Sequence, residues 1–484
     1  MNSCKFPVWS AALLAAVVGI AALGVSPESG TGIATAHAHA QVRLAHTVGL
    51  GMGGSGNPMP SQALINEILY RFGNPDPPFF PGQPSFAVDS VLPLFTPAGM
   101  YPSTGVRSLT LDTSIAQGVG VLHNAITGEI AAGNNVVVAG GSQSATIASI
   151  EMARLLALPE DERPTADQLS FLLLVDPSNP NGGLLSRFGD PTLPSLYIDS
   201  FGIDFSGATP ADTPWDTAIY NVEYDGFSDF PRYPLNVLSV LNAVAGIAFA
   251  HRDAVQLSDE RTAQIVELPV SDDYTGHTRY FMIPTENLPL LELLRFVPIL
   301  GDPLADLVQP FLRVLVNLGY GNIENGWDPG PANLATPFGL FPADLDWNEV
   351  FAALVDGAKQ GVNDFAADLR SLSIPGVVTE VAAASAGLVA LPGLADLVSA
   401  FAGVLSAGYS SMLPLADAVS ALTLSLPTYQ LELFAHGLSD GDLLGAIGMP
   451  IAAGFGLTPV AIGFGLFGLV DVVNSITNGF AELF

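Results

Sequence analysis

The stretch that decides the fold is N-V-V-V-A-G-G-S-Q-S-A-T-I-A-S, residues 135–149. The β-branched run from Val136 to Val138 predicts a strand, and the two glycines that follow predict a tight turn. Ser142 stands at this turn, and the small residues after it can begin a helix. A strand, a tight turn and a helix in this order form a nucleophile elbow, which exposes a serine oxygen above a parallel sheet. The pattern is G-x-S-x-S, with Ser144 in place of the usual second glycine.

A second serine, Ser439, fits G-x-S-x-G fully, in residues 437–441. Its context argues against it, because no Val- or Ile-rich strand leads into this segment. In α/β-hydrolases the serine, the acid and the histidine follow one another along the chain in that order. His436 is the last histidine of the sequence, so none follows Ser439. Ser142 is therefore the predicted nucleophile.

The composition limits the classes of partner. The chain has 484 residues, of which 49% are hydrophobic and 13% charged, with a mean hydropathy of +0.43. This is more apolar than an ordinary soluble protein and predicts contact with lipid or a membrane. The net charge of −31 argues against nucleic acid as a partner. The only cysteine, Cys4, allows no disulfide framework, and the scattered histidines lack metal-ligand spacing, so no metal or other cofactor is expected.

The N-terminal segment resembles an export signal. Lys5 is the only charge before an uncharged run from Phe6 to Pro27, and residues 34–40 offer several A-x-A cleavage sites. The run is long for a signal peptide and just long enough to span a bilayer. Residues 1–40 are thus either a cleaved signal peptide or a membrane anchor, and in both cases the rest of the chain lies outside the cytoplasm.

Predicted strands and helices alternate after this segment. The expected strands are residues 46–52, 136–138, 171–175 and 218–224, and the expected helices are residues 61–71, 114–127, 145–158 and 235–250. Asp112, Thr113 and Ser114 are candidate caps for the second helix, and the Pro-rich residues 75–106 read as loop. This alternation predicts an α/β fold with a mainly parallel sheet and helices on both faces. We expect the catalytic domain to span residues 41–325.

The remaining residues, 326–484, are expected to form an apolar helical region. From Ser371 onward the sequence contains no Lys or Arg and eight acidic residues, and residues 443–470 carry no charge. Glycines and two prolines interrupt this run, and flanking cations that would anchor a membrane span are missing. Helices that cover the active site or dip into lipid are the preferred interpretation, and a true span is the alternative.

A serine nucleophile needs a base, and the base needs a carboxylate that orients it. His251, which follows a predicted helix, and His277, in a polar loop, are the candidate bases. The acid is expected just after the strand at residues 218–224, where Asp225 and Asp229 both occur, and the sequence does not decide between them. The oxyanion hole is expected from two backbone N–H groups, one of Gln143 and one from the loop after the first strand. In that loop the candidates are Gly54 and Ser55.

Five ordered motifs resemble the PE-PPE domain of mycobacteria, over roughly residues 46–325. They are Gly53–Gly56 with Pro58 and Pro60, Gly140–Ala145, Asp176–Gly183 with Arg187 and Phe188, Tyr224–Pro231 with Tyr233–Asn236, and Leu290–Leu291 onward to Leu318–Tyr320. The resemblance implies a cutinase-like α/β-hydrolase with a Ser-Asp-His triad. The family's nucleophile falls on Ser142, its histidine on His251, and its acid on Asp225 or Asp229.

The layout with an export segment and an apolar tail is similar to the membrane-anchored members that transfer acyl groups on trehalose glycolipids. The resemblance thus implies an exported serine acyltransferase or esterase of the cell envelope, which acts on a lipid ester or glycolipid. Two alternatives stay open: a lipase or carboxylesterase that hydrolyses lipid esters, and a non-catalytic envelope scaffold that binds lipid.

Overall fold

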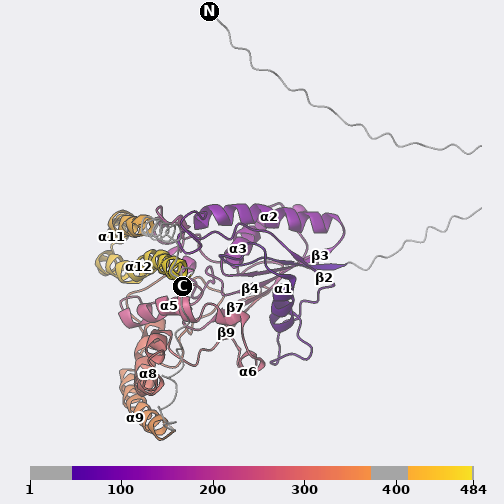
Figure 1. Cartoon of the computed structure of the whole chain (residues 1–484). Helices are drawn as coiled ribbons and strands as arrows, with labels where there is room; N and C mark the ends of the chain where they lie inside the picture. Colours follow the sequence, from indigo (N-terminus) through magenta and orange to yellow (C-terminus); the bar gives the residue numbers. More distant parts are fainter. Residues whose placement is uncertain (1–45, 372–411, 482–484) are drawn as a thin grey trace, which may run out of the picture. The chain divides into compact units, whose positions relative to one another are not determined.

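A computed structural model of the chain describes residues 46–371 and 412–481 (Figure 1). The predicted export segment, residues 1–40, lies outside the described residues, and so does Cys4. The proposed boundaries at residues 40 and 325 stay predictions.

The main sheet of the described residues has seven strands in the order β2-β1-β3-β4-β7-β9-β8. They are β1 (Thr47–Gly51), β2 (Ser90–Pro93), β3 (Asn135–Gly141), β4 (Leu169–Leu174), β7 (Asp216–Val222), β8 (Val266–Glu267) and β9 (Thr278–Ile283). Every neighbouring pair is parallel except β8 with β9. A separate antiparallel pair is formed by β5 (Tyr197–Ile198) and β6 (Ile203–Asp204). The prediction of a mainly parallel sheet is confirmed.

Strand β3 shows why both faces of the sheet are covered. Successive residues of a strand point to opposite faces, and all of Val136 to Ala139 are buried. Val136 and Val138 belong to a core with residues of helices α2 and α3, whereas Val137 and Ala139 belong to another core that includes residues of α1. Figure 1 shows α2 and α3 on one side of the sheet and α1 on the other. A strand buried on both faces must be continuously apolar, which is the signal that the sequence carries at this point.

Of the α-helices in residues 46–325, four (residues 62–68, 111–131, 143–156 and 237–249) lie close to where the sequence places them, and the other four were not predicted. The bounds of these helices are α1 (Gln62–Ile68), α2 (Leu111–Ala131), α3 (Gln143–Leu156), α4 (Leu184–Phe188), α5 (Val237–Phe249), α6 (Asp259–Thr262), α7 (Glu292–Arg295) and α8 (Gly301–Asn317). Helix α2 begins earlier than expected. Its N-cap is Thr110, and the carboxylate of Asp112, inside the first turn, accepts a hydrogen bond from the N–H of Thr113.

Three strands of the main sheet, β2, β8 and β9, were not predicted from the sequence, and β8 has only two residues. Strand β2 is a four-residue edge strand that pairs only with β1. It lies inside the Pro-rich residues 75–106, which the sequence analysis assigned to a loop. Strand β9 follows the polar loop that contains His277, and Arg279 interrupts its apolar pattern. Short strands and strands with one charged residue give weak periodic signals.

The C-terminal region, residues 326–484, is helical only in part: residues 326–346 form turns and irregular segments, where the sequence predicted helix, and most of the remaining described residues are helical. It contains α9 (Trp347–Ser371), α11 (Leu426–Ser439) and α12 (Leu443–Ala481). Buried residues of α11 and α12 share one core with α4, β5, β6 and α5. Among the described residues one helical segment, Leu443–Leu466, is long and apolar enough to cross a membrane, with a mean hydropathy of 1.6. Within the 18-residue window that defines this segment, 39% is buried inside the structure.

Candidate active site

Ser142 lies at the turn between β3 and α3, with a strained backbone at φ 58° and ψ −125°. Non-glycine residues rarely adopt a positive φ, and such strain concentrates at functional turns. Gly140 is required here, because a Cβ atom on it would lie 2.7 Å from the carbonyl oxygen of Ser144. The side chain of Ser144 fits the second glycine position because its hydroxyl bonds within the turn. Its Oγ accepts from the N–H of Gly141 at 2.8 Å and donates to the carbonyl oxygen of Met52 at 3.2 Å.

The structure brings three of the candidate side chains together. Nε2 of His251 lies 2.8 Å from Oγ of Ser142, and Nδ1 of His251 lies 2.8 Å from Oδ2 of Asp225. The side chain of Asp225 is fully buried, and that of His251 is 14% exposed. Asp225 also accepts hydrogen bonds from the N–H of Phe227 at 3.1 Å and from the hydroxyl of Ser228 at 2.6 Å. A carboxylate held in this way can fix the tautomer and the orientation of an imidazole.

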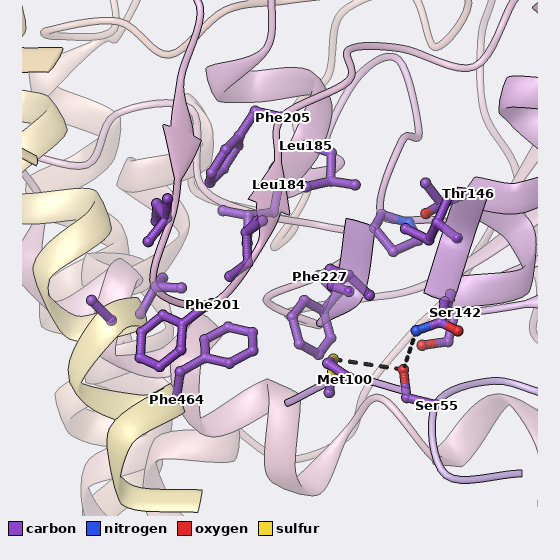
Figure 2. Close-up of a pocket in the computed structure, with 18 residues that line it drawn as sticks. Ser55, Met100, Ser142, Thr146, Leu184, Leu185, Phe201, Phe205, Phe227 and Phe464 are labelled. Atoms are coloured by element: carbon purple, nitrogen blue, oxygen red, sulfur yellow. Dashed lines mark hydrogen bonds between the residues drawn. The ribbon is translucent and has the colours of Figure 1, made fainter. Parts of the chain in front are cut away.

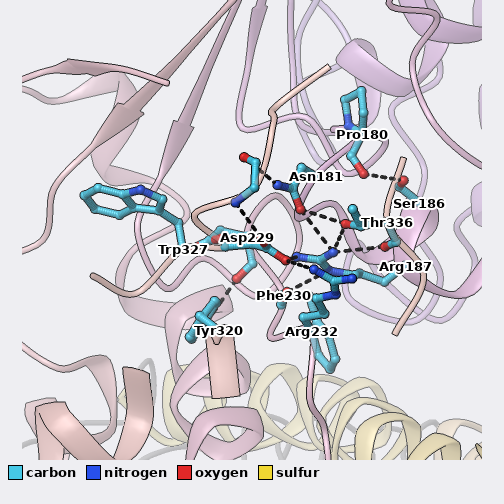
Figure 3. Close-up of polar contacts among 12 residues, drawn as sticks. Pro180, Asn181, Ser186, Arg187, Asp229, Phe230, Arg232, Tyr320, Trp327 and Thr336 are labelled. Carbon is cyan, nitrogen blue, oxygen red and sulfur yellow. Dashed lines mark hydrogen bonds and ion pairs between the residues drawn. The ribbon is translucent and has the colours of Figure 1, made fainter. Parts of the chain in front are cut away.

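Asp229, the other candidate acid, does not touch the histidine. Its Oδ2 accepts a hydrogen bond from the N–H of Tyr224 at 2.9 Å, and its side chain is fully buried. Burial raises the pKa of Asp229 well above its usual range. Figure 3 shows Asp229 beside Tyr320, whose hydroxyl donates to the carbonyl oxygen of Asp229 at 3.2 Å. Of the two aspartates that the sequence left open, only Asp225 lies in position to orient His251.

Arg187 lies in the same polar cluster as Asp229 and is buried (Figure 3). Its guanidinium contacts Asp328 at 3.6 Å and the carbonyl oxygen of Thr336 at 2.9 Å. Arg232 also pairs with Asp328, at 3.1 Å. Because both arginines pair with the same buried carboxylate, they connect helix α4 and the segment around Arg232 to the loop that contains Asp328.

The predicted oxyanion residues lie beside the serine. The N–H of Gln143 belongs to the first turn of α3, where N–H groups have no acceptor within the helix. A Cβ atom on Gly54 would lie 3.2 Å from Cβ of Ser142, so the backbone of this loop passes close to the nucleophile. The side chain of Gln143 is fixed by bonds to the carbonyl oxygen of Gly99 at 2.6 Å and to the hydroxyl of Ser55 at 3.3 Å.

The other histidines lie elsewhere. His277 immediately precedes strand β9, at the amino end of the parallel strands, and lies 3.3 Å from exposed Asp216. Ser142 stands at the opposite, carboxyl end of β3. The serine of the second motif, Ser439, ends helix α11 and donates to the carbonyl oxygen of His436. No group of His, Cys, Asp and Glu that would hold a metal ion occurs in the part of the chain that the structure describes.

An apolar pocket of about 580 Å³, its open mouth included, begins at Ser142. Figure 2 shows Ser142 and Ser55 at one end of it and Phe201 and Phe464 at the other, next to helix α12. Phe464 comes from the C-terminal region, as do Val460 and Ala461, which also line the pocket. The sequence gives no local signal for these wall residues, because they are ordinary members of a long apolar helix.

Phe227 is a further residue that motif reading missed. Its ring packs edge-to-face on His251, with ring centroids 5.1 Å apart, and it also lines the pocket. It occurs in the segment Tyr224–Pro231 that contains both candidate acids, so its place beside them was visible in the sequence.

The fold and this geometry define a class: α/β proteins with a serine, a histidine and an aspartate in hydrogen-bond contact at the carboxyl end of a parallel sheet. A model of the PE-PPE domain matches residues 89–321. This match confirms the resemblance to the PE-PPE domain that the motifs predicted.

Three relatives come from Mycobacterium tuberculosis. The uncharacterized PPE family protein PPE28 is 41% identical over 89% of this chain and 66% of its own length. Esterase PE16 is 46% identical over 58% of this chain and 52% of its own length. The SL1278 acyltransferase Chp1 is 30% identical over 50% of this chain and 55% of its own length. The chain thus spans about half to two thirds of the lengths of these relatives.

Among solved structures, a cutinase-like protein from Cryptococcus sp. matches with a TM-score of 0.22 and 14% identity. The match covers 38% of this chain and 79% of the cutinase-like protein.

Proposed function

We propose that the chain is a serine-dependent acyltransferase or esterase that forms an acyl-enzyme on Ser142. The observation that carries this proposal is the unbroken contact from Ser142 through His251 to Asp225, at 2.8 Å in each step. A serine hydroxyl is a weak nucleophile at neutral pH, and an imidazole within hydrogen-bond reach takes its proton as the oxygen attacks.

The reaction begins when Oγ of Ser142 bonds to the carbonyl carbon of an ester and its proton passes to Nε2 of His251. Asp225 holds the proton on Nδ1 and stabilises the imidazolium that forms. The carbonyl oxygen becomes an oxyanion, for which the N–H groups of Gln143 and of Gly54 or Ser55 are the proposed donors. The bond to the leaving alcohol then breaks, and that alcohol takes the proton from Nε2.

The acyl-enzyme is then attacked by a second hydroxyl, of either a sugar or water. We propose transfer to the sugar of a trehalose glycolipid, because a relative is named as an acyltransferase and the sequence resembles family members that transfer acyl groups on such lipids. The apolar walls from α12 support this choice, since transfer requires that water be kept from the acyl-enzyme. Hydrolysis is the second candidate, because the relative named as an esterase is the more similar one, at 46% against 30% identity.

We also propose that the enzyme acts outside the cytoplasm at a lipid surface of the envelope. The export-like sequence of residues 1–40 and the apolar helical segment Leu443–Leu466 support this location. The substrate is then a lipid ester or a glycolipid.

Labelling with a fluorophosphonate probe, followed by intact-mass analysis, tests the nucleophile. The wild-type chain is expected to gain one adduct that maps to Ser142, and Ser142→Ala is expected to gain none. Equal labelling of both proteins, or no labelling of the wild type, would favour a non-catalytic lipid-binding scaffold. Product analysis with an acyl ester, with and without added trehalose, then separates transfer from hydrolysis: acyl-trehalose is the expected product, and free fatty acid alone would indicate an esterase.

A further inference from the structure

A second apolar chamber lies behind the pocket that begins at Ser142. It is a narrow space of about 220 Å³ with its open solvent included, and its walls come from the region of the strand pair β5–β6 and from the C-terminal helices. Its lining residues are Leu196, Ile198, Ala421, Leu426, Leu457 and Ala461. Ile198 and Ala461 also line the first pocket, so these two side chains form the wall that the chambers share. Both are nearly inaccessible, at 5% and 4% exposure.

The chemistry of the first chamber limits the kind of ligand that it can hold. Its polar lining residues come from the elements around the nucleophile: Ser55, Ser142, Gln143 and Thr146. The rest of the lining is aliphatic or aromatic apart from Met100 and Pro177, and no charged side chain contributes to either chamber. A sugar in this space would leave its hydroxyls without partners, which costs free energy. A ligand with one carbonyl at Ser142 and a long apolar chain matches this distribution.

The far end of the first chamber is firmly built. The rings of Phe201 and Phe464 pack against each other with centroids 5.7 Å apart, and Phe464 also contacts Phe227 at 6.2 Å (Figure 2). The segment around β5 is tied to the C-terminal region by a hydrogen bond from the hydroxyl of Ser200 to the carbonyl oxygen of Asp417, at 2.8 Å. Because protein interiors pack tightly and resist deformation, a wall fixed in this way limits the length of what it encloses.

We propose that the first chamber binds a single unbranched acyl chain, and that Ile198 and Ala461 act as a ruler that sets its maximum length. The proposal rests on the proposed function, because the acyl chain must start from the carbonyl carbon bound to Ser142. Helix α12 is then part of the substrate site as well as a cover over it. The second chamber is the space that a longer chain enters once the shared wall is opened.

Hydrolysis of p-nitrophenyl esters from butyrate to palmitate by the full chain tests the ruler. Ile198→Ala opens the shared wall, and we expect the ratio of kcat/KM for palmitate to that for butyrate to rise about tenfold or more. Ala461→Leu fills the end of the first chamber, and we expect the same ratio to fall about tenfold or more. One methylene more or less in an apolar pocket changes specificity by roughly 10- to 200-fold.

Ile462→Ala is the matched control, since Ile462 neighbours Ala461 on α12 but is 44% exposed and lines neither chamber. It is expected to leave the ratio unchanged. Fluorophosphonate labelling reports whether each variant is folded. If one of the two wall variants fails to label, the palmitate-to-butyrate ratio of the other variant tests the proposal. Labelled wall variants with the wild-type ratio, or with ratios that move in the same direction, would overturn the ruler. A wild-type chain that neither labels at Ser142 nor cleaves any ester would instead overturn the proposed function.

Discussion

The strained backbone of Ser142 and the hydrogen-bond partners of Asp225 both hold side chains of the site in fixed positions. A serine at a positive φ cannot relax into the helix that follows, so its oxygen stays at the pocket mouth. Asp225 is held by two donors besides His251, which leaves its carboxylate little freedom. Groups fixed before substrate binds need little reorganisation during the reaction, which is the main source of electrostatic catalysis.

The two neighbouring aspartates allow a direct test of which one orients His251. In Asp225→Asn the amide cannot stabilise the imidazolium and favours the wrong tautomer, so kcat is expected to fall about 10⁴-fold. Asp229→Asn keeps an acceptor for the N–H of Tyr224 and replaces a group whose raised pKa already favours the neutral form. Its kcat is expected to stay within about tenfold of the wild-type value. Ester hydrolysis rates measure both effects, and a reversed order would make Asp229 the orienting acid.

Asp176, which follows strand β4, makes the stability of the fold depend on pH. It is fully buried, and burial raises its pKa to about 6. In the unfolded chain its pKa is about 3.9, so between these values the folded chain keeps a proton that the unfolded chain loses. This contribution to stability is therefore complete below about pH 4 and is lost as the pH rises through about 6.

Asp176→Asn removes this dependence. From pH 4 to pH 7, the free energy of unfolding of the variant relative to the wild type is expected to rise by up to about 3 kcal/mol. Urea unfolding of both proteins at the two pH values measures the difference. An identical difference at both pH values would mean that the carboxyl group of Asp176 titrates normally in the fold.

At the scale of elements, the contact between α5 and the turn after β7 sets the geometry of the site. A Cβ atom on Gly246 would lie 1.9 Å from the carbonyl oxygen of Tyr224, and one on Gly226 would lie 2.3 Å from that of Ala243. The two backbones therefore touch, which is possible only with glycine at both positions. Because His251 follows α5 and Asp225 lies in the turn, this close approach brings the imidazole to the carboxylate.

Gly246→Ala is expected to push α5 away from the turn and to displace His251. A shift of about 1 Å at a reacting group can cost about 10²-fold in rate, so kcat is expected to fall by about that factor. Gly128→Ala in α2 is the control, because a Cβ atom there meets nothing within 4 Å. The control is expected to keep its activity and to gain roughly 0.5–1 kcal/mol of stability from the better helix former. Equal activities of the two variants would show that the α5 contact does not position the histidine.

The same elements explain how much the sequence revealed. Ser142 and its elbow were predictable because the strand, the turn and the helix are contiguous in the sequence. The choice between Asp225 and Asp229 was not, because the two residues are four positions apart in one turn and their directions depend on the packing of α5. Strand β9 was missed because its place in the sheet comes from pairing with β7, which local periodicity does not report.

At the scale of the whole molecule, the pocket joins segments from both ends of the described chain. Ser55 follows the first strand, whereas Ala461 and Phe464 lie in the last helix. The sequence predicted an apolar region that covers the site, but it contained no signal for which of its residues face the pocket. Long-range contacts of this kind are fixed by the fold, and similar apolar residues occur along the whole of α12.

Helix α12 exposes many of its large apolar residues to solvent. Alanines are frequent on its buried side, whereas large apolar residues are exposed: Leu443, Leu444, Ile447, Ile451, Phe455, Ile462 and Leu466. Most of these exposed residues recur at intervals of about four, which places them along one side of a helix. Exposed apolar patches of this kind mark interaction with proteins or membranes, and the proposed location favours a lipid surface.

The charge of the chain predicts which lipid surface this helix prefers. With a net charge of −31 and no Lys or Arg after Arg370, the chain is repelled by anionic lipids. In co-sedimentation we expect stronger binding to phosphatidylcholine vesicles than to phosphatidylglycerol vesicles. Added salt is expected to reduce this difference in binding, because it screens the repulsion. Ile447→Glu with Phe455→Glu is expected to weaken binding to both, whereas Leu109→Glu, which precedes α2, is expected to leave it unchanged. Binding that survives the double substitution would place the lipid contact on another surface of the molecule.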